Sequence, residues 1–526
     1  MSQVLNDNVH WADLAADKII RGNNDKDSYT LASGITPSGV VHFGNFREVI
    51  TVDFVARALR KKGKKVRFIF SWDDYDTFRK VPANLPKQEE LQKFLFNPIV
   101  DTPDPFGTAE SYAAHHEKNF EAQVAKMGIE VEPIYQSKKY RAGAYREQII
   151  HVLKNKDKIA EILNKWRQAP LEDSWLPVLI YCEKCNRDRI KTITFDGKNT
   201  LNYECEMCNH QGSEDLTTTT RTKLPWRVDW PMRWGFEKVD FEPGGKDHSS
   251  EGGSFTTAKE IVEIFNWKAP QYLQYDFVSI KGMGGKMSSS KGNLVTVNDV
   301  LDVYEPEMVR WIFASYKPNT DFGLSFDLDV IKNYEDFDRL ERMVFGAEAG
   351  NEKKVAMAKR VYELSQIGDA PTELPIQPGF RHLCNVLQIN DLEIEKARPF
   401  YAKDIKNARD ERRFKERAER AVFWIENHAP DEFKFSLNKS ATKLDLDEKQ
   451  NKFLVDLKNL LTSEFDQLDE KALHEKMYEM IHALELQPMD VFTMMYRKLI
   501  SLEKGPKLAG FMKIIGKERV LKLIEN

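Results

Sequence analysis

Hydrophobic residues recur at two different periods in the first part of the chain. Apolar side chains at a spacing of three and four predict helices over residues 9–22 and 46–59. Short apolar runs at 29–32 and 66–71 predict strands, and the second run is typical of a strand covered on both faces of a parallel sheet. Strand, helix and strand in this order predict a doubly wound parallel sheet that binds its ligand beyond the carboxyl ends of its strands.

The pattern becomes almost wholly helical after residue 297. Apolar residues recur at helical spacing over 306–313, 331–345, 353–365, 403–426, 448–461, 471–484 and 489–500. The fold class that we predict is therefore α/β, with a Rossmann-like domain followed by an all-α C-terminal domain.

Composition narrows the class of protein. The 526 residues suffice for two to four domains, and 41% hydrophobic and 30% charged residues are typical of a soluble globular protein. The net charge of -4 gives no global basic field, so any polyanion must meet a local patch. The acidic, amphipathic N-terminus does not resemble a signal peptide, and five cysteines do not make a disulfide scaffold. We expect a cytoplasmic monomer that binds neither membrane nor DNA.

A loop of small and polar residues joins the strand at 29–32 to the helix at 46–59. Such a loop leaves backbone N–H groups and a helix N-terminus free to meet an anion, so a nucleoside triphosphate is the expected ligand. The residues expected to bind ATP here are Pro37, Ser38, Gly39, His42, Gly44 and Asn45. Taken alone, the segment is equally compatible with a glycine-rich turn that binds nothing.

A second glycine-rich segment lies about 240 residues downstream and carries two lysines, Lys286 and Lys291. A loop of this composition can close over phosphates and neutralise charge that develops on pyrophosphate. The residues expected to contact ATP from this segment are Lys286, Met287, Ser288, Ser289 and Ser290. Alone it would be interpreted as a basic surface loop, but the two segments together indicate phosphate chemistry.

Four cysteines form two C-x2-C pairs separated by nineteen residues. They are Cys182, Cys185, Cys205 and Cys208. This spacing predicts a closed tetrahedral site for structural Zn²⁺ in a zinc ribbon, with no open position for catalysis. Because the segment interrupts the α/β pattern, residues 98–222 are predicted to be an insertion between two halves of the sheet.

The two glycine-rich segments resemble the HIGH and KMSKS signatures of class I aminoacyl-tRNA synthetases. Five blocks resemble, in sequence and in order, the class I lysyl-tRNA synthetases of the archaeal type: ASGITPSGVVHFGN, FIFSWDDYDTFRKVP, RVDWPMRW, GGKDHSSEGGS and GGKMSSSKG. The resemblance covers residues 30–292 and fits the total length. It implies ATP-dependent activation of L-lysine, with Mg²⁺ accompanying ATP, and transfer to the 3′ end of tRNA-Lys.

The resemblance also implies roles for single residues. The expected catalytic residues are His42 and Asn45, which would hydrogen-bond the triphosphate, and Lys286 and Lys291, which would stabilise the departing pyrophosphate. Ser289 departs from the pattern, because many class I enzymes carry a lysine there. The residues expected to bind the lysine substrate or the adenylate are Gly34, Thr36, Asp73, Asp74, Trp230 and His248.

The domain boundaries implied by the resemblance divide the chain into four regions. They are a catalytic domain (1–97 and 223–297), an acceptor-end insertion (98–222), a stem-contact region (298–344) and an anticodon-binding domain (345–526). Within the last, residues 396–420 hold ten basic and five acidic side chains. They form either a phosphate-facing surface or a solvated helix face with i,i+4 ion pairs, such as Glu411 with Lys415.

Three alternatives remain open from the sequence. Another class I synthetase, for arginine, cysteine or glutamate, would share both signatures. A small-molecule nucleotidyltransferase would leave the zinc ribbon and the helical half unexplained, and a non-catalytic tRNA-binding relative would be expected to lack His42 or Lys286. The sequence does not decide which acid binds the lysine ammonium. It also does not decide whether Asp104 and His115 hold a second metal, although we favour the interpretation that His115 and His116 are ordinary helix residues and not metal ligands.

Overall fold

The structure, a computed structural model, describes residues 7–83, 85–281 and 294–525. Within these ranges, no helix is both long enough and apolar enough to cross a membrane. The chain folds into two compact units. The first unit comprises Met1–Leu301, Pro306–Leu324 and Ala349–Ala370, and the second comprises Asp302–Glu305, Ser325–Glu348 and Pro371–Asn526.

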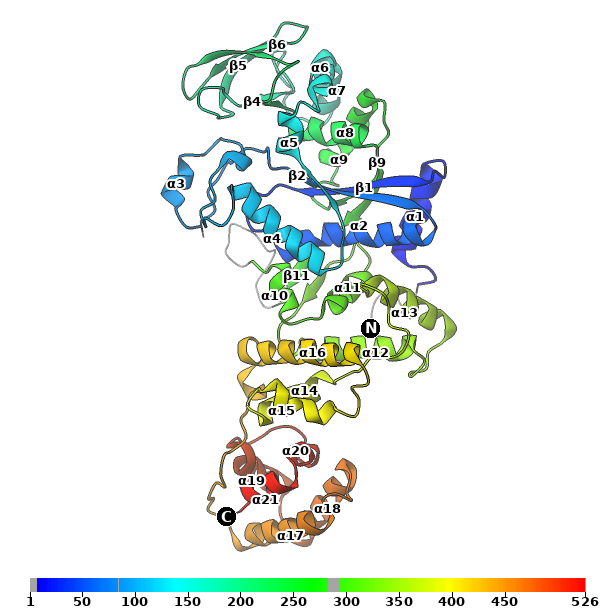
Figure 1. The fold of residues 1–526 in the computed structure, drawn as a ribbon, viewed down its shortest axis with the longest axis vertical. Helices are drawn as coiled ribbons and strands as arrows, with labels where there is room; N and C mark the ends of the chain where they lie inside the picture. Colours follow the sequence, from blue (N-terminus) through cyan, green and yellow to red (C-terminus); the bar gives the residue numbers. More distant parts are fainter. Residues whose placement is uncertain (1–6, 84, 282–293, 526) are drawn as a thin grey trace. The chain divides into compact units, whose positions relative to one another are not determined.

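A five-stranded sheet in the order β10-β9-β1-β2-β3 forms the centre of the first unit (Figure 1). Its strands are β1 (Ser28–Ile35), β2 (Lys65–Trp72), β3 (Glu132–Tyr135), β9 (Val239–Gly245) and β10 (Gln271–Tyr275). Every neighbouring pair is parallel, which confirms the predicted doubly wound sheet. The strand order reverses between β1 and β9, and ligands of such sheets bind at this switch point.

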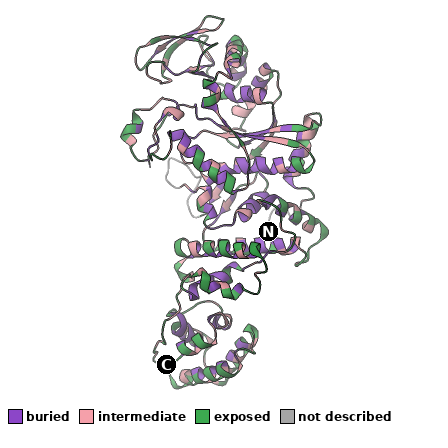
Figure 2. Cartoon of the chain, in the orientation of Figure 1, coloured by how far each residue is buried: buried purple, intermediate pink, exposed green. Residues whose placement is uncertain are grey.

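Helices cover the sheet, and one of them, α2, is almost entirely buried against β1 and β2 (Figure 2). The helices of the first unit are α1 (Trp11–Gly22), α2 (Phe43–Lys61), α3 (Gln88–Gln92), α4 (Tyr112–Lys126), α5 (Gln136–Arg141), α6 (Arg146–Lys154), α7 (Lys156–Asn164), α8 (Trp226–Glu237), α9 (Ser254–Ile261), α10 (Val297–Leu301), α11 (Pro306–Ser315) and α13 (Glu352–Ser365). Short strands β11 (Val278–Ile280) and β12 (Phe322–Leu324) pair in parallel.

The four-cysteine segment forms a small antiparallel sheet of its own. Its strands are β5 (Ile190–Phe195), β6 (Thr200–Cys205) and β7 (Gln211–Asp215), next to a two-stranded pair of β4 (Leu179–Ile180) and β8 (Thr222–Lys223). The predicted start of the insertion at residue 98 needs correction, because β3 lies beyond it and still pairs with β2. The sequence pattern does not predict β3, because this strand has only four residues and one of them is Pro133. The proline is tolerated because β3 is an edge strand.

The second unit is helical, as predicted. Its helices are α12 (Asp329–Val344), α14 (Phe380–Ile389), α15 (Ile394–Ala397), α16 (Ala408–Asn427), α17 (Glu448–Glu464), α18 (Glu470–Ala483), α19 (Pro488–Ile500), α20 (Leu508–Ile515) and α21 (Lys517–Leu523). Each predicted helix of this half is found within a few residues of its expected bounds. The predicted boundary at residue 345 differs from the observed units, because α13 packs on α11 in the first unit and α12 belongs to the second.

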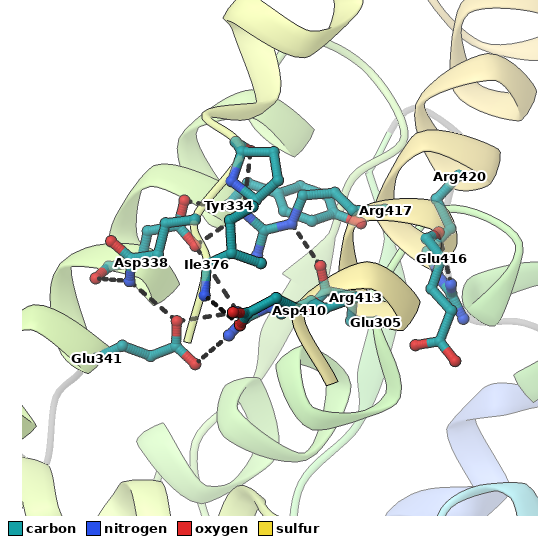
Figure 3. A network of polar contacts seen from close by, with 12 residues as sticks. Glu305, Tyr334, Asp338, Glu341, Ile376, Asp410, Arg413, Glu416, Arg417 and Arg420 are labelled. Carbon is teal, nitrogen blue, oxygen red and sulfur yellow. Dashed lines mark hydrogen bonds and ion pairs between the residues drawn. The ribbon is translucent and has the colours of Figure 1, made fainter. Parts of the chain in front are cut away.

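Buried ion pairs fix α16 to α12 and to Glu305 (Figure 3). Arg417 donates to Glu305 Oε1 at 2.5 Å and to Asp338 at 3.0 Å, and Arg413 donates to Glu341 at 2.9 Å. Burial alone would raise the pKa of Glu305, but Arg417 and Arg413 outweigh it and hold that pKa at about 2. The inward-facing cations of α16, Arg413 and Arg417, are therefore paired within this network.

Replacing Arg417 with methionine is expected to destabilise the protein by about 3–5 kcal/mol, because Glu305 and Asp338 would stay buried without their cation. Glu305 contributes stability above its unfolded pKa of about 4.3 and loses it as pH falls towards 2, so the difference from wild type should shrink over that range. Urea unfolding at several pH values measures this. Arg412→Met, on the exposed side of the same helix, is the control, and equal stability of the two variants would contradict the assignment.

Candidate functional site

A cavity of about 580 Å³ lies in the first unit, where β1, β2 and β9 end. Cavities of this size accommodate small-molecule ligands and cofactors. The predicted site residues that line it are Gly34, Thr36, Ser38, Gly39, His42, Gly44, Asn45, Asp73 and His248. The sequence-predicted positions Pro37, Asp74 and Trp230 are not among its lining residues.

The N-terminus of α2 faces this cavity. His42 is the N-cap residue of α2, and its backbone N–H donates to Asn45 Oδ1 at 3.3 Å. Tyr112 donates to the carbonyl oxygen of Ser38 at 3.0 Å and so fixes the preceding loop. The positive end of a helix macrodipole suits a phosphate, the ligand expected for this segment.

Glu48 lies deeper in the same cavity and was not predicted from the sequence. Its Oε1 accepts from Gly34 N at 3.0 Å, and its Oε2 accepts from the Tyr275 hydroxyl at 2.6 Å. Burial raises the pKa of Glu48 to about 8, although both hydrogen bonds lower it. Among the described residues, no lysine or arginine pairs with Glu48. The carboxyl is thus positioned to receive a cation that the described part of the chain does not supply.

Two carboxylates at the carboxyl end of β2, those of Asp73 and Asp76, already have cations. Asp73 accepts from Arg233 at 2.6 Å, and Arg233 also lies 3.3 Å from Asp229. Asp76, which lines the cavity, accepts from Lys223 at 2.5 Å. Burial raises the pKa of Asp73 to about 6, and Arg233 limits the rise. These acids form internal ion pairs, so they are less suited than Glu48 to bind a substrate cation.

Two of the predicted substrate residues sit behind the cavity wall. The Asp74 carboxylate accepts from the backbone N–H of Ser137 at 2.7 Å and from its hydroxyl. Trp230 stacks on Trp226, with ring centroids 5.1 Å apart and planes at 13°, and only Trp226 lines the cavity. Trp226 therefore forms the aromatic wall of the cavity, and Trp230 packs behind it. The ring centroids of Trp226 and His248 are 6.2 Å apart.

Comparison with known proteins agrees with this geometry. A family model described as "tRNA synthetases class I (K)" matches residues 9–368, more than half of the chain. The chain belongs to this family. Because the match spans both halves of the sheet, the cavity lies within the part of the chain that defines the class I synthetase.

Two curated relatives of this synthetase are lysine–tRNA ligases. That of Borreliella burgdorferi is 47% identical over 518 residues, covering 98% of each chain. That of Thermococcus kodakarensis is 41% identical over 525 residues, covering 98% of this chain and 99% of the relative. A solved glutamate tRNA ligase from Elizabethkingia meningosepticum covers 94% of this chain and 98% of its own at 14% identity, with a TM-score of 0.42.

The second signature of this synthetase lies outside the described residues, so the structure does not describe Lys286, Met287, Ser288, Ser289, Ser290 or Lys291. The chain on either side of it is described and lies at the cavity. Val278 lines the cavity before the signature, and after it Val295 O accepts from the N–H of Phe43 at 2.7 Å, at the start of α2.

The four cysteines of the synthetase converge as their spacing predicted. Their sulfur atoms lie within 4.8 Å of one another, with 3.7 Å between Cys182 and Cys208 and 3.6 Å between Cys185 and Cys205. A tetrahedral ion with metal–sulfur bonds of about 2.3 Å requires sulfurs about 3.8 Å apart. The donor set and its spacing therefore fit a four-thiolate metal site.

Asp104 and His115 belong to no group of three or more metal-ligating side chains within the described part of the chain. The described residues contain one group of His, Cys, Asp or Glu that could hold a metal, the four cysteines. Asp104 instead accepts from the backbone N–H groups of Phe106, Thr108 and Ala109 at 2.7–3.0 Å. His115 lies on α4 and contacts the Thr108 hydroxyl at 2.8 Å, in agreement with the interpretation as a helix residue.

Proposed function

We propose that this class I synthetase is a lysine–tRNA ligase, which activates L-lysine with ATP and transfers it to the 3′ end of tRNA-Lys. The observation that carries the choice of amino acid is Glu48, a half-buried carboxyl in the cavity that has no cationic partner among the described residues. An ammonium group placed there would gain a charge-assisted hydrogen bond in a site shielded from water. The tRNA and ATP follow from the family.

The lysine side chain would extend into the cavity between Glu48 and the aromatic wall. Its ammonium would donate to Glu48, whose two oxygens are held by Gly34 and Tyr275. Its apolar stem would lie against Trp226, because long basic side chains pack their methylene groups on apolar surfaces. An arginine, cysteine or glutamate side chain does not combine a compact cation with this length.

The chemical steps need positioning and charge stabilisation rather than a protein nucleophile. A lysine carboxylate oxygen forms a bond to the α-phosphorus, the bond from that phosphorus to the bridging oxygen breaks, and pyrophosphate leaves. His42, Asn45 and the N-terminus of α2 would bind the triphosphate as charge builds, and Lys286 and Lys291 would stabilise the pyrophosphate. A hydroxyl of the terminal tRNA adenosine then attacks the lysyl carbonyl, and AMP leaves. Mg²⁺ bound with ATP would neutralise phosphate charge.

Lysine-dependent exchange of pyrophosphate into ATP, measured with and without tRNA, tests the activation step. We expect exchange with lysine and none with arginine, cysteine or glutamate. Exchange driven by one of those amino acids would overturn the choice of substrate, and exchange with no amino acid would favour a different reaction.

We further propose that the four cysteines hold one structural Zn²⁺. Cys182→Ser should abolish zinc retention after dialysis, as measured by atomic emission, and should lower the melting temperature because metal binding contributes to folding. Cys384→Ser, at the fifth and isolated cysteine in α14, is the matched control and should keep the ion. Equal zinc content in the two variants would contradict the site.

The rest of the proposal concerns the whole chain. The region around the cysteines would contact the acceptor end of tRNA, residues 298–344 its stem, and the C-terminal helices its anticodon. A cytoplasmic location fits a translation enzyme whose five cysteines form no disulfide. A monomer of 61.0 kDa is expected in light scattering, without affinity for membrane or DNA.

A further inference from the structure

Exposed cations form a row on α16 and on the turn before it, in the second unit. Lys403, Lys406, Arg409, Arg412 and Lys415 recur at every third position, and all five are exposed. Exposed and buried positions alternate along this helix (Figure 2). We call these five residues the basic stripe.

None of the five side chains in the basic stripe has an ion pair or a hydrogen bond within the described part of the chain. The predicted pair of Glu411 with Lys415 does not form, because Glu411 instead pairs with Arg398 at 2.7 Å. The exposed acids of the same stretch, Asp404, Glu416 and Glu419, also leave the stripe unpaired. The sequence left two interpretations of this region, a phosphate-facing surface and a solvated helix face with i,i+4 ion pairs. The ion pair that the second interpretation requires of Lys415 is not found.

The other cations of the region are used for folding. Arg413 and Arg417 lie in the buried network with Glu305, Asp338 and Glu341 (Figure 3). This network fixes which side of α16 faces inward, so the three stripe residues on this helix, Arg409, Arg412 and Lys415, are held outward. Arg409 and Lys415 are then about 9 Å apart along the helix axis and about 120° apart around it, so the helical part of the stripe winds across the outward side of α16. In a chain with a net charge of -4, such a row is a local positive field and not a general property of the surface.

We propose that the basic stripe binds the phosphodiester backbone of tRNA. The inference rests on the proposed function, which makes tRNA a substrate. A row of cations without acidic partners is complementary to consecutive phosphates, and their binding releases condensed counterions. Such contacts position the RNA and do not read its bases, so they act on affinity rather than on the choice of tRNA.

The test removes three charges, in Arg409→Gln, Arg412→Gln and Lys415→Gln together, and measures tRNA binding from about 50 to about 200 mM salt. Each phosphate contact contributes about 0.7–0.9 to the slope of log affinity against log salt, so the slope should fall by about 2–3. Affinity near 150 mM salt should drop roughly tenfold or more. The kcat of lysine transfer at saturating tRNA should persist, because no stripe residue lines the cavity.

Two control variants separate this role from general charge and from folding. Lys61→Gln, Lys62→Gln and Lys64→Gln together remove the same charge from lysines that pair with acids outside the regions assigned to tRNA contacts, and should leave the slope unchanged. Arg409→Lys, Arg412→Lys and Lys415→Arg together keep the charge and should keep the slope.

An unchanged slope in the glutamine variant, or an equal fall in the paired-lysine control, would overturn the proposal. So would a variant that binds tRNA normally but loses binding to phosphatidylserine vesicles, because the partner would then be a membrane surface. A wild-type protein that binds tRNA through the stripe but never charges it would contradict the proposed function and leave this inference standing.

Discussion

Replacing Glu48 with glutamine is expected to raise the KM for lysine roughly 30-fold or more, since loss of one partner from a buried charge pair costs about 2–5 kcal/mol. Glutamine keeps an oxygen that accepts from the Gly34 N–H, and its amide NH2 can donate to the Tyr275 hydroxyl, so the fold of the cavity should persist. Steady-state kinetics with varied lysine measure the effect. The kcat at saturating lysine should change much less than KM, because the substituted group binds the side chain and not the reacting atoms.

The same substitution should remove a pH dependence. The pKa of Glu48 lies near 8, so the ionised fraction of the free protein rises between pH 7 and pH 9. Because apparent affinity scales with the competent fraction, the wild-type KM for lysine should fall about tenfold over that range. The glutamine variant should show a flat profile. The titration of Asp73, whose pKa is about 6, lies below this window.

Stability should respond in the opposite direction. Glu48 has a folded-state pKa of about 8, above its unfolded value of about 4.3, so the folded protein retains a proton that the unfolded chain loses. The free energy of unfolding therefore falls as pH rises from about 4.3 to about 8. Glutamine has no proton to lose, so the Glu48→Gln variant should gain melting temperature relative to wild type at pH 8 compared with pH 5.

Glu117→Gln is the matched control for Glu48. Glu117 is buried, burial raises its pKa to about 8 as it does that of Glu48, and Glu117 does not line the cavity. Its replacement should leave the KM for lysine unchanged at every pH. A KM for Glu48→Gln within about threefold of wild type would remove Glu48 as the residue that selects lysine.

The second large effect is expected at the two signatures. His42→Ala and Lys286→Ala should each lower kcat about 100-fold, because a lost donor to charge that develops in the transition state costs roughly 3 kcal/mol. The KM for lysine should change little, since neither side chain is assigned to the lysine ammonium. Single-turnover formation of the adenylate measures this step without product release.

A control variant for this effect is Lys281→Ala, at an exposed lysine that does not line the cavity. It should retain full turnover. If His42→Ala and Lys286→Ala each left turnover within a factor of about three, neither signature would take part in the chemistry.

The sequence predicts the parts of the fold whose pattern is local. The helical period finds α2 and the helices of the second unit, the apolar run finds β2, and cysteine spacing finds a site whose sulfurs do converge. It does not find β3, because four residues with Pro133 at the sheet edge carry neither period. An element can be predicted from the sequence only when it is long enough for its pattern to repeat.

Long-range pairing explains what the sequence could not predict about the site. Asp73 follows a buried strand and looks available to a ligand, yet Arg233 neutralises it from 160 positions away. Glu48 carries no signal beyond its spacing of three from Asn45, which places both on one side of α2. Only the packing of α2 against the sheet shows that this carboxyl lies beside Gly34 of β1 and Tyr275 of β10.

Charging of total tRNA by the purified protein, with ATP, Mg²⁺ and each of the twenty labelled amino acids in turn, decides which amino acid this synthetase activates. We expect label on tRNA with lysine alone, and we expect that label to be lost in the Glu48→Gln variant at low lysine concentration. Label with another amino acid would keep the family and contradict the assignment of Glu48, and no label with any amino acid would contradict the proposed reaction itself.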